Sequence, residues 1–388
     1  MSTSTFSASM NRRTAIKGLA GLGIAAAGMG LGLSLDRTPA LAEDKGEEAK
    51  TQTVTDMEGT EVTMPYDLQN VAITSWKGSI GSFVLLGHAD KIKICCSCER
   101  YRWLCHAIPE LATLPNYGSF NDINVEEMFQ ANPDVVISPA AASDATEKMR
   151  DLGLTVFVDG TNPKDASDVF ATQYEELEAA AAMLHEEEKL QSYFDWNEKL
   201  MQEVEDRVAD IAEEDKKRVL VVRSNMEEVF CANISLGHTV TLAGGKLVTD
   251  EMNEYYTQVD TEQVISWNPE VIFQQIVTVD QDTVTGLYNE WSADQRYMNM
   301  PAIQTGDVYI MPMGITQWGG DIESGLGMLL IGKLLYPERF EDMDVLEYAT
   351  EFYKTFMNYE LGEEDYAFLF RDMEGAKSLG VVPEKDEK

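Results

Sequence analysis

The chain has 388 residues, 44% of them hydrophobic, and carries 67 Asp and Glu residues against 30 Lys and Arg residues, a net charge of −37. This length exceeds what one ordinary core fills, so we expect two domains, and the hydrophobic content excludes a disordered chain. The acidic balance argues against duplex nucleic acid and against an anionic membrane surface as partners, because both are bound through clustered Lys and Arg.

The N-terminus has the layout of an export signal. The pair Arg12-Arg13 precedes an uncharged stretch of 18 residues, 18–35, that is rich in Gly and Ala, and the small-x-small sequence Ala40-Leu41-Ala42 follows. Paired arginines predict the twin-arginine route, with residues 1–42 removed and the protein released at the periplasmic or extracellular face of the cell membrane. The alternative is a retained membrane anchor, for which this stretch is at the short end.

Strands and helices are expected to alternate in the first half of the chain. Residues 43–52 are charged and predict a flexible leader, and residues 53–65 alternate around Glu58-Gly59, which predicts a hairpin. Strands are expected at 70–75, 91–96, 134–138 and 154–159, and helices at 79–87, 124–131 and 145–153. This alternation predicts a parallel, helix-covered sheet, which we assign to an N-terminal lobe, residues 53–165.

A long helical run follows the first lobe. Residues 166–214 have apolar residues at helical spacing and no interior Gly or Pro, which predicts one connecting helix, broken once or not at all, in a segment 166–216. A second lobe is expected at 217–388, with strands at 217–224, 270–277 and 307–312 and helices at 260–267, 325–337 and 344–361. The fold class is therefore α/β, with two mostly parallel sheets.

Two segments of the chain repeat each other at an offset of 136 residues. They are "NVEEMFQANPDVVI" at 124–137 and "DTEQVISWNPEVIF" at 260–273, and they align Glu126 with Glu262. Each copy predicts a helix, a tight Asn-Pro turn and a buried strand. A two-fold repeat at this spacing indicates two similar lobes.

The repeated helices begin with capping-box patterns. Asn124 is followed three residues later by Glu127, and Asp260 by Gln263. The two aligned glutamates then fall in the first helical turn, where the helix dipole favours negative charge. Stabilisation of the helix start explains both glutamates, and it does not exclude a second role.

These motifs, with "TDMEGTEVTMP" at 55–65 and "LLIGKLLYPERF" at 329–340, resemble the substrate-binding proteins of ABC importers for iron-siderophores, haem and cobalamin. The resemblance covers residues 53–370. It implies a monomer with two Rossmann-like lobes joined by one rigid helix, a ligand cleft between them and no intrinsic cofactor. It also implies that Glu126 and Glu262 dock on basic residues of a dimeric ABC permease that works with an ATPase.

Loops at the carboxyl ends of parallel strands form the ligand crevice in open α/β sheets. The expected loops hold aromatic residues, which suit a large flat ligand, and a few cations, which suit carboxylate or catecholate oxygens. We therefore expect an iron chelate, haem or cobalamin as cargo, although ordinary packing explains any single aromatic. The ligand-binding candidates are Trp76, Lys77, Cys98, Arg100, Tyr101, Trp103, Phe120, Phe230, Cys231 and Trp318.

A group of cysteines is the unusual feature of the first lobe. Cys95 and Cys98 have C-x-x-C spacing, which favours metal or redox chemistry, and Cys105 with His106 would complete a four-ligand metal site. A disulfide or free thiols compete with the metal site, because exported proteins form disulfides. The sequence leaves these alternatives open.

Other classes of protein fit the sequence less well. No G-x-S-x-G, P-loop or G-x-G-x-x-G motif lies at an expected strand-helix junction, so we expect no enzyme. A redox or metallocluster protein built on Cys95 and Cys98 is a weaker alternative. A binding protein for a free divalent metal ion is another, but such proteins usually offer three His and a carboxylate, and the chain has four His, two of them poorly placed.

Overall fold

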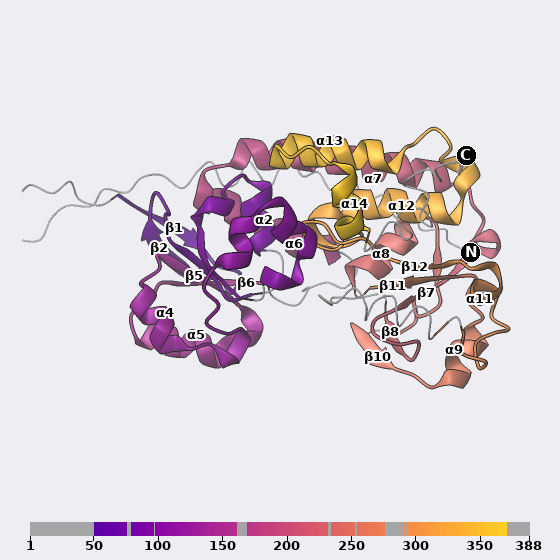
Figure 1. Cartoon of the computed structure of the whole chain (residues 1–388), viewed down its shortest axis with the longest axis horizontal. Helices are drawn as coiled ribbons and strands as arrows, with labels where there is room; N and C mark the ends of the chain where they lie inside the picture. The colour runs from indigo at the N-terminus through magenta and orange to yellow at the C-terminus, as the bar shows by residue number, and fades with distance from the viewer. Residues whose placement is uncertain are drawn as a thin grey trace, which may run out of the picture. The chain divides into compact units, whose positions relative to one another are not determined.

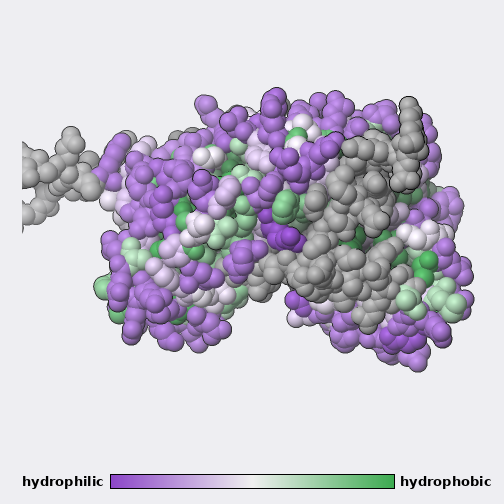
Figure 2. Space-filling view, viewed as in Figure 1, coloured by the Kyte–Doolittle hydropathy of each residue, from purple (hydrophilic) through white to green (hydrophobic). Residues whose placement is uncertain are grey.

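Figure 1 shows the computed structural model of the chain, which describes residues 50–75, 79–96, 98–160, 169–231, 234–252, 254–275, 291 and 293–370. These residues all belong to the unit Ala49–Lys388. The predicted signal lies outside them, as do Trp76 and Lys77. No helix in the described ranges combines the length and hydropathy that a bilayer span requires. Hydrophilic residues cover most of the described surface on the face drawn in Figure 2.

A two-stranded hairpin precedes the first sheet. β1 (Thr51–Thr55) pairs antiparallel with β2 (Glu61–Pro65), which confirms the predicted hairpin. Gly59 takes a φ of 85° in the turn, and one oxygen of the Asp56 carboxylate accepts two backbone N–H groups there. The other oxygen pairs with Arg150 at 3.2 Å, which fixes the hairpin to the N-terminal lobe.

Four parallel strands form the sheet of the N-terminal lobe, in the order β4-β3-β5-β6. They are β3 (Val71–Ile73), β4 (Ile92–Cys95), β5 (Val135–Pro139) and β6 (Val156–Asp159). Nearly all of their residues are buried, as expected where helices cover both faces of a parallel sheet. The covering helices are α2 (Ser79–Leu85), α4 (Val125–Ala131), α5 (Ser143–Asp151) and α6 (Val169–Leu184).

Successive residues of each strand point into two different cores. Ala72 and Val136 pack with Met128 of α4 and Met149 of α5, in a core that belongs to this lobe alone. Ile73 faces the opposite way, into a larger core that includes residues of α2 and α6. Figure 1 agrees, with α4 and α5 on one side of the sheet and α2 and α6 on the other.

The C-terminal lobe has a mixed sheet in the order β10-β8-β7-β11-β12, with β9 also paired to β7. Its strands are β7 (Arg218–Val222), β8 (Glu228–Phe230), β9 (Lys246–Leu247), β10 (Tyr256–Gln258), β11 (Val271–Gln274) and β12 (Val308–Ile310). β7, β9, β11 and β12 are parallel, whereas β8 and β10 form an antiparallel edge that the sequence did not predict. The helices around it are α8 (Ser235–Leu242), α9 (Thr261–Trp267), α11 (Pro301–Thr305) and α12 (Ser324–Leu335).

The described part of the connecting segment contains two helices, α6 and α7 (Glu187–Val208), separated at His185 and Glu186, and α7 ends at Val208 rather than at the predicted 214. His185 has a φ of 58°, in the left-handed region that ends a helix. Its ring stacks on that of Tyr66, with centroids 4.1 Å apart, and its Nε2 lies 3.1 Å from the Tyr66 carbonyl oxygen. This contact with the hairpin explains why the run turns here although it lacks Gly and Pro.

One buried cluster reaches from the first sheet to the second. It joins Ile73 of β3 to Phe273 of β11 through apolar residues of α6, α7, α12 and α13 (Val345–Met357). The last described helix, α14 (Glu363–Leu369), packs on α3 (Arg102–Ala107) of the first lobe. The remaining described helical turns are short: Ala89–Lys91, Cys98–Arg100, Pro109–Thr113, Phe120–Asp122, Ala140–Ala142, Glu213–Asp215, Asp321–Glu323 and Pro337–Arg339.

Candidate functional site

The repeated segments form α4 and α9, two helices with the same pattern of burial. Met128 in α4 and Val264 in α9 are fully buried, each in the outer core of its own lobe. Glu126 and Glu262, two residues before them, are exposed. The two glutamates therefore stand at equivalent places on the surfaces of the two lobes.

Both helices begin and end in the same way. The side chains of Asn124 and Asp260 accept the backbone N–H three residues further on, at 3.2 Å and 2.7 Å, as predicted for N-caps. Each helix ends at an asparagine in the left-handed region, Asn132 with a φ of 47° and Asn268 with a φ of 48°. The repeat in the sequence is thus a repeat of backbone geometry.

Trp103 and Trp318 are fully buried, which corrects the expectation that they contact the ligand. Trp103 donates its indole N–H to Asp365 at 3.2 Å, and its ring lies 4.5 Å from the ring of Tyr353. Trp318 donates its indole N–H to the hydroxyl of Tyr353 at 3.1 Å. Since neither ring leaves surface open to a ligand, both belong to the core that α13 and α14 close.

The other aromatic candidates are mostly buried as well. Tyr101 is 6% exposed, Phe230 is 5% exposed, and Cys231 is fully buried. Phe120 is half-buried. Arg100 lies in a helical turn, with its side chain outside the described part of the structure. A continuous aromatic wall is therefore not formed by these residues, and the ligand contacts of Phe120 and Arg100 stay predictions.

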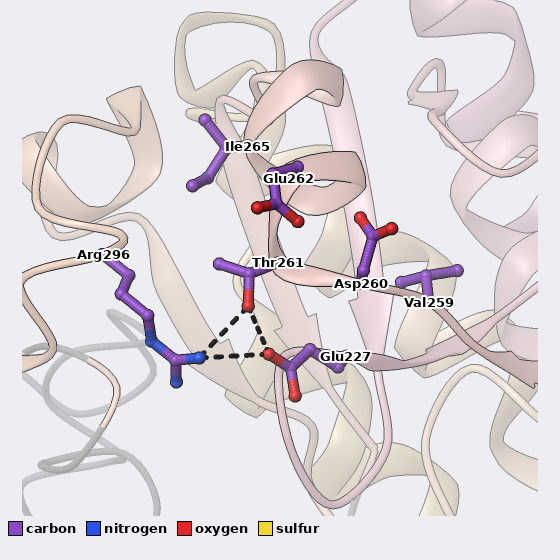
Figure 3. A pocket seen from close by; sticks show the side chains of 7 residues that line it. All are labelled: Glu227, Val259, Asp260, Thr261, Glu262, Ile265 and Arg296. Carbon is purple, nitrogen blue, oxygen red and sulfur yellow. Dashed lines mark hydrogen bonds and ion pairs between the residues drawn. The ribbon is translucent and has the colours of Figure 1, made fainter.

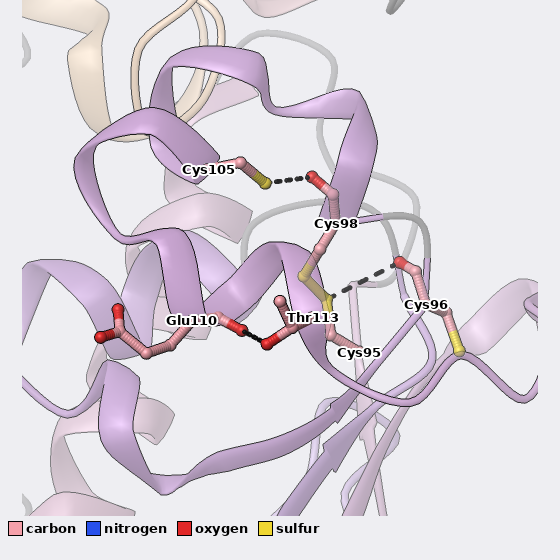
Figure 4. The surroundings of a disulfide bond; sticks show 6 residues. All are labelled: Cys95, Cys96, Cys98, Cys105, Glu110 and Thr113. Carbon is pink, nitrogen blue, oxygen red and sulfur yellow. Dashed lines mark hydrogen bonds between the residues drawn. A yellow bond between two sulfur atoms is a disulfide. The ribbon is translucent and has the colours of Figure 1, made fainter.

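Cys95 and Cys98 form a disulfide at the end of β4 (Figure 4). Because the two sulfurs are bonded to each other, the predicted metal site of Cys95, Cys98, Cys105 and His106 is not formed. Cys105 donates its thiol to the carbonyl of Cys98 at 3.1 Å. Burial raises the pKa of Cys105 to about 11, so this thiol keeps its proton near neutral pH.

His106 is engaged elsewhere. Its ring stacks on Phe368 with centroids 4.3 Å apart, and its Nε2 lies 3.5 Å from the carboxylate of Asp365. Among the described residues, no three His, Cys, Asp or Glu side chains gather as metal ligands. The disulfide, one of the alternatives open from the sequence, is the arrangement that this structure has.

Polar side chains near the carboxyl ends of the strands, and one on α6, carry buried atoms that lack a hydrogen-bond partner in the described part of the chain. They include Ser79 Oγ, Gln173 Oε1, Gln274 Oε1, Gln275 Oε1 and Gln317 Nε2. Ser79 begins α2 after the loop from β3, and Gln274 ends β11. Open α/β sheets bind ligands at these ends, and buried polar groups without partners are suited to bind one. Glutamine at a strand end matches no ligand pattern, so the sequence did not single these residues out.

The helix that carries Gln173 and the loop that carries Gln317 both contact the start of α8. Gln173 of α6 donates its Nε2 to the hydroxyl of Ser235, at the start of α8, at 2.7 Å. A Cβ added to Gly320 would lie 3.6 Å from Cβ of Ser235, and one added to Gly81 of α2 would meet the 311–320 loop at 3.1 Å. α2, α6, α8 and the loop after β12 therefore meet at one place, which we take as the candidate ligand cleft.

Glu323 fixes the 311–320 loop from inside. Its carboxylate is fully buried and accepts the backbone N–H groups of Ile315 and Thr316, both at 2.7 Å, and the hydroxyl of Tyr353 at 2.8 Å. Burial raises the pKa of Glu323 to about 7. A Cβ at Gly314 would collide with Glu323 and Tyr353, so the loop and the carboxylate are fitted to each other.

A surface pocket of about 560 Å³ lies beside α9 rather than at the ends of the strands (Figure 3). Within it Thr261 donates its hydroxyl to Glu227, and Nη1 of Arg296 lies 3.1 Å from Thr261 and 3.3 Å from Glu227. Its lining residues are Glu227, Val259, Asp260, Thr261, Glu262, Ile265 and Arg296. The pocket therefore belongs to the surface around Glu262 and not to the candidate cleft.

Comparison with known proteins identifies the class. The model of the family described as periplasmic binding protein matches residues 71–313, more than half of the chain. The chain belongs to this family, whose members are non-enzymatic, substrate-binding components of ABC importers. This confirms the resemblance drawn from the sequence.

The relatives with similar sequences are named after different ligands. The molybdate-binding protein MolA of Haemophilus influenzae is 25% identical over 271 residues, 64% of this chain and 74% of MolA. The vitamin B12-binding protein of Vibrio campbellii is 25% identical over 209 residues, 52% of this chain and 68% of that protein. The solved structure of MolA bound to molybdate has a TM-score of 0.72 at 20% identity, covering 80% of this chain and 99% of that one. The structural likeness establishes the fold alone.

Proposed function

We propose that this chain captures an iron-siderophore, haem or cobalamin-type chelate in the cleft between its lobes and delivers it to a dimeric ABC permease. The observation that supports this best is the set of polar groups near the strand ends and on α6. The atoms without partners on Gln173, Gln274 and Gln275 are acceptors, that of Gln317 is a donor, and the Ser79 hydroxyl can be either. Such a site suits a cargo with both donors and acceptors on its periphery.

The character of these groups bears on the class of cargo. They are neutral amides and a hydroxyl, and each amide can turn either its oxygen or its NH2 group toward a ligand. None of them carries the positive charge that a buried oxyanion favours. A corrinoid or a siderophore chelate carries amide or hydroxyl groups that satisfy donors and acceptors alike. The peripheral polar groups of haem are two propionates, so haem is the least favoured of the three chelates. The metal would arrive within the cargo, and the protein would hold it through the periphery of the chelate.

Titration calorimetry and absorbance spectra of the full chain test the cargo. The probes are cyanocobalamin, a ferric hydroxamate siderophore, haemin and sodium molybdate. We expect one of the three chelates to bind with one-to-one stoichiometry and Gln275→Leu to weaken it about tenfold, the value of one buried hydrogen bond or slightly more. Leu152→Ala, a change at an exposed site, is the control and should leave affinity unchanged. Binding of molybdate in place of every chelate would overturn the proposal.

Molybdate is the second candidate cargo. The observation that favours it is the similarity to MolA, in sequence and in fold. The titration above decides between the two. A site for a bare divalent ion gains no support, because the described residues bring together no set of ligands for one.

Delivery is proposed to run through Glu126 and Glu262, which are exposed and equivalent in the two lobes. A monomer with two such carboxylates suits a permease with two-fold symmetry. Export is proposed to use the twin-arginine route, with residues 1–42 removed. Lys at both Arg12 and Arg13 should retain the protein in the cytoplasm, as cell fractionation would show, and unchanged export would exclude this route.

A further inference from the structure

Two exposed apolar side chains repeat together with the glutamates of α4 and α9. Phe129 is 49% exposed and Ile265 is 41% exposed. They are 136 residues apart, and each follows its glutamate, Glu126 or Glu262, by three residues. Residues three apart on an α-helix share a face. Each lobe therefore presents a carboxylate and an apolar side chain next to each other.

Buried residues of each lobe orient this face of the helix toward solvent. Met128 and Val264, which directly precede the two apolar residues, are fully buried. With these neighbours anchored in the outer cores, Phe129 and Ile265 are held toward solvent. Figure 3 shows Glu262 and Ile265 both projecting from α9. Single exposed apolar residues are ordinary on protein surfaces, but two held outward at equivalent positions of two lobes need a cause.

We propose that the docking surface of each lobe is a carboxylate–apolar pair, Glu126 with Phe129 and Glu262 with Ile265. Its occupant is the transmembrane permease dimer, which would offer a basic side chain beside an apolar recess at each of two symmetric sites. This inference rests on the proposed docking role of the glutamates. An ion pair open to water contributes little to affinity, whereas an apolar neighbour that excludes water strengthens it.

The charges around the C-terminal pair fit a basic partner. Asp260 is exposed beside Glu262. The cation that lines the pocket, Arg296, is paired with Asp294 at 2.8 Å and with Glu227 at 3.3 Å. The net charge of −37 attracts a basic surface over a longer range, and it opposes association with a second copy of the chain.

Three double variants of the full chain test the proposal against the purified permease–ATPase complex in lipid nanodiscs. They are Phe129→Ala with Ile265→Ala, Glu126→Gln with Glu262→Gln, and a matched control, Leu152→Ala with Met298→Ala, whose parent side chains are 47% and 54% exposed. We expect the first to weaken binding about tenfold or more at low and at high salt. The second should weaken binding mainly at low salt, where charges are least screened, and the control should bind as the wild type does.

The possible results separate this inference from the proposed function. If the Phe129/Ile265 variant binds normally while the glutamate variant is weakened, the apolar part is wrong and the docking role stands. If the glutamate variant also binds normally, the docking role itself fails. Leucine at both positions should restore binding, and a loss there would overturn the apolar contact. Sedimentation would assign the face to a second copy of the chain if the wild type is a dimer and the Phe129→Ala, Ile265→Ala variant is a monomer.

Discussion

Trp103 donates its indole N–H to the carboxylate of Asp365, 262 residues further along the chain, at 3.2 Å. The same carboxylate, only 1% exposed, accepts the hydroxyl of Tyr359 at 2.7 Å and the backbone N–H of Gly362 at 2.6 Å. These buried hydrogen bonds hold α14 on α3. α14 therefore stabilises a segment of the first lobe that the sequence alone assigned to ligand binding.

Trp103→Ala should lower the free energy of unfolding by about 3–5 kcal/mol, because it removes a fully buried aromatic side chain. Trp103→Phe should cost less, about 1–3 kcal/mol, since it keeps a ring against Tyr353 and loses only the hydrogen bond to Asp365. Urea denaturation measures both. If Trp103→Ala leaves stability unchanged and abolishes cargo binding, Trp103 is a ligand contact after all.

Glu323 should make stability depend on pH. Burial raises its pKa from the ordinary 4.5 to about 7, so between these values the native state binds more protons than the unfolded state. The contribution of this group is therefore fully present below pH 4.5 and is lost as the pH rises through 7, by about 3 kcal/mol in total.

Glu323→Gln removes this titration and supplies the comparison. Urea denaturation at a series of pH values measures the free energy of unfolding of both proteins. The value for the wild type, relative to that of the variant, should fall between pH 4.5 and 7 and level off at higher pH. A difference that stays constant with pH would show that Glu323 is ionised throughout.

Serine at both Cys95 and Cys98 should lower the free energy of unfolding by about 2 kcal/mol, since a disulfide across a short loop constrains the unfolded chain only modestly. The absorbance spectrum of the bound cargo should not shift, because sulfurs bonded to each other do not contact a metal. Alkylation of the denatured, unreduced protein should modify only Cys96, Cys105 and Cys231. A spectral shift in the variant would place sulfur on the metal.

Alanine at Asn132 and at Asn268 should each lower the free energy of unfolding by about 1 kcal/mol, because both positions have a positive φ that alanine tolerates poorly. Glycine at either position should be tolerated, since it adopts this conformation without steric cost. Chemical denaturation of the four single variants checks this. A clear difference between the two positions would mean that the lobes are not equivalent there.

The parts of the fold that depend on nearby residues could be predicted. α4 and α9 were found with their caps, because the groups that satisfy the first turn lie within three residues of each other. Most buried strands were found as short apolar runs. β8 (Glu228–Phe230) and β10 (Tyr256–Gln258) were missed because neither is an apolar run, unlike β12, a strand of the same length that was predicted. Their pairing with each other and with β7 specifies them more than their own sequence does.

The candidate ligand site could not be predicted in the same way. The aromatic residues that follow β4 and β12 have the composition of a cleft wall. Trp103 and Trp318 are buried by α13 and α14 instead, and contacts over such distances in sequence leave no local signal. The buried glutamines were not predicted, because nothing in the sequence around Gln274 and Gln317 marks them. They stand out only in the structure, where each has a buried side-chain atom without a hydrogen-bond partner.

The buried cluster that joins Ile73 of the first sheet to Phe273 of the second determines how the chain denatures. The helices α6, α7, α12 and α13 cover an apolar face of both sheets. If these helices detach from one sheet, the apolar face of the other sheet is exposed as well. The lobes, although each has a sheet and an outer core of its own, therefore behave as one cooperative unit that unfolds in a single transition. Cutting the chain between them would yield two fragments that acquire structure only when they are mixed.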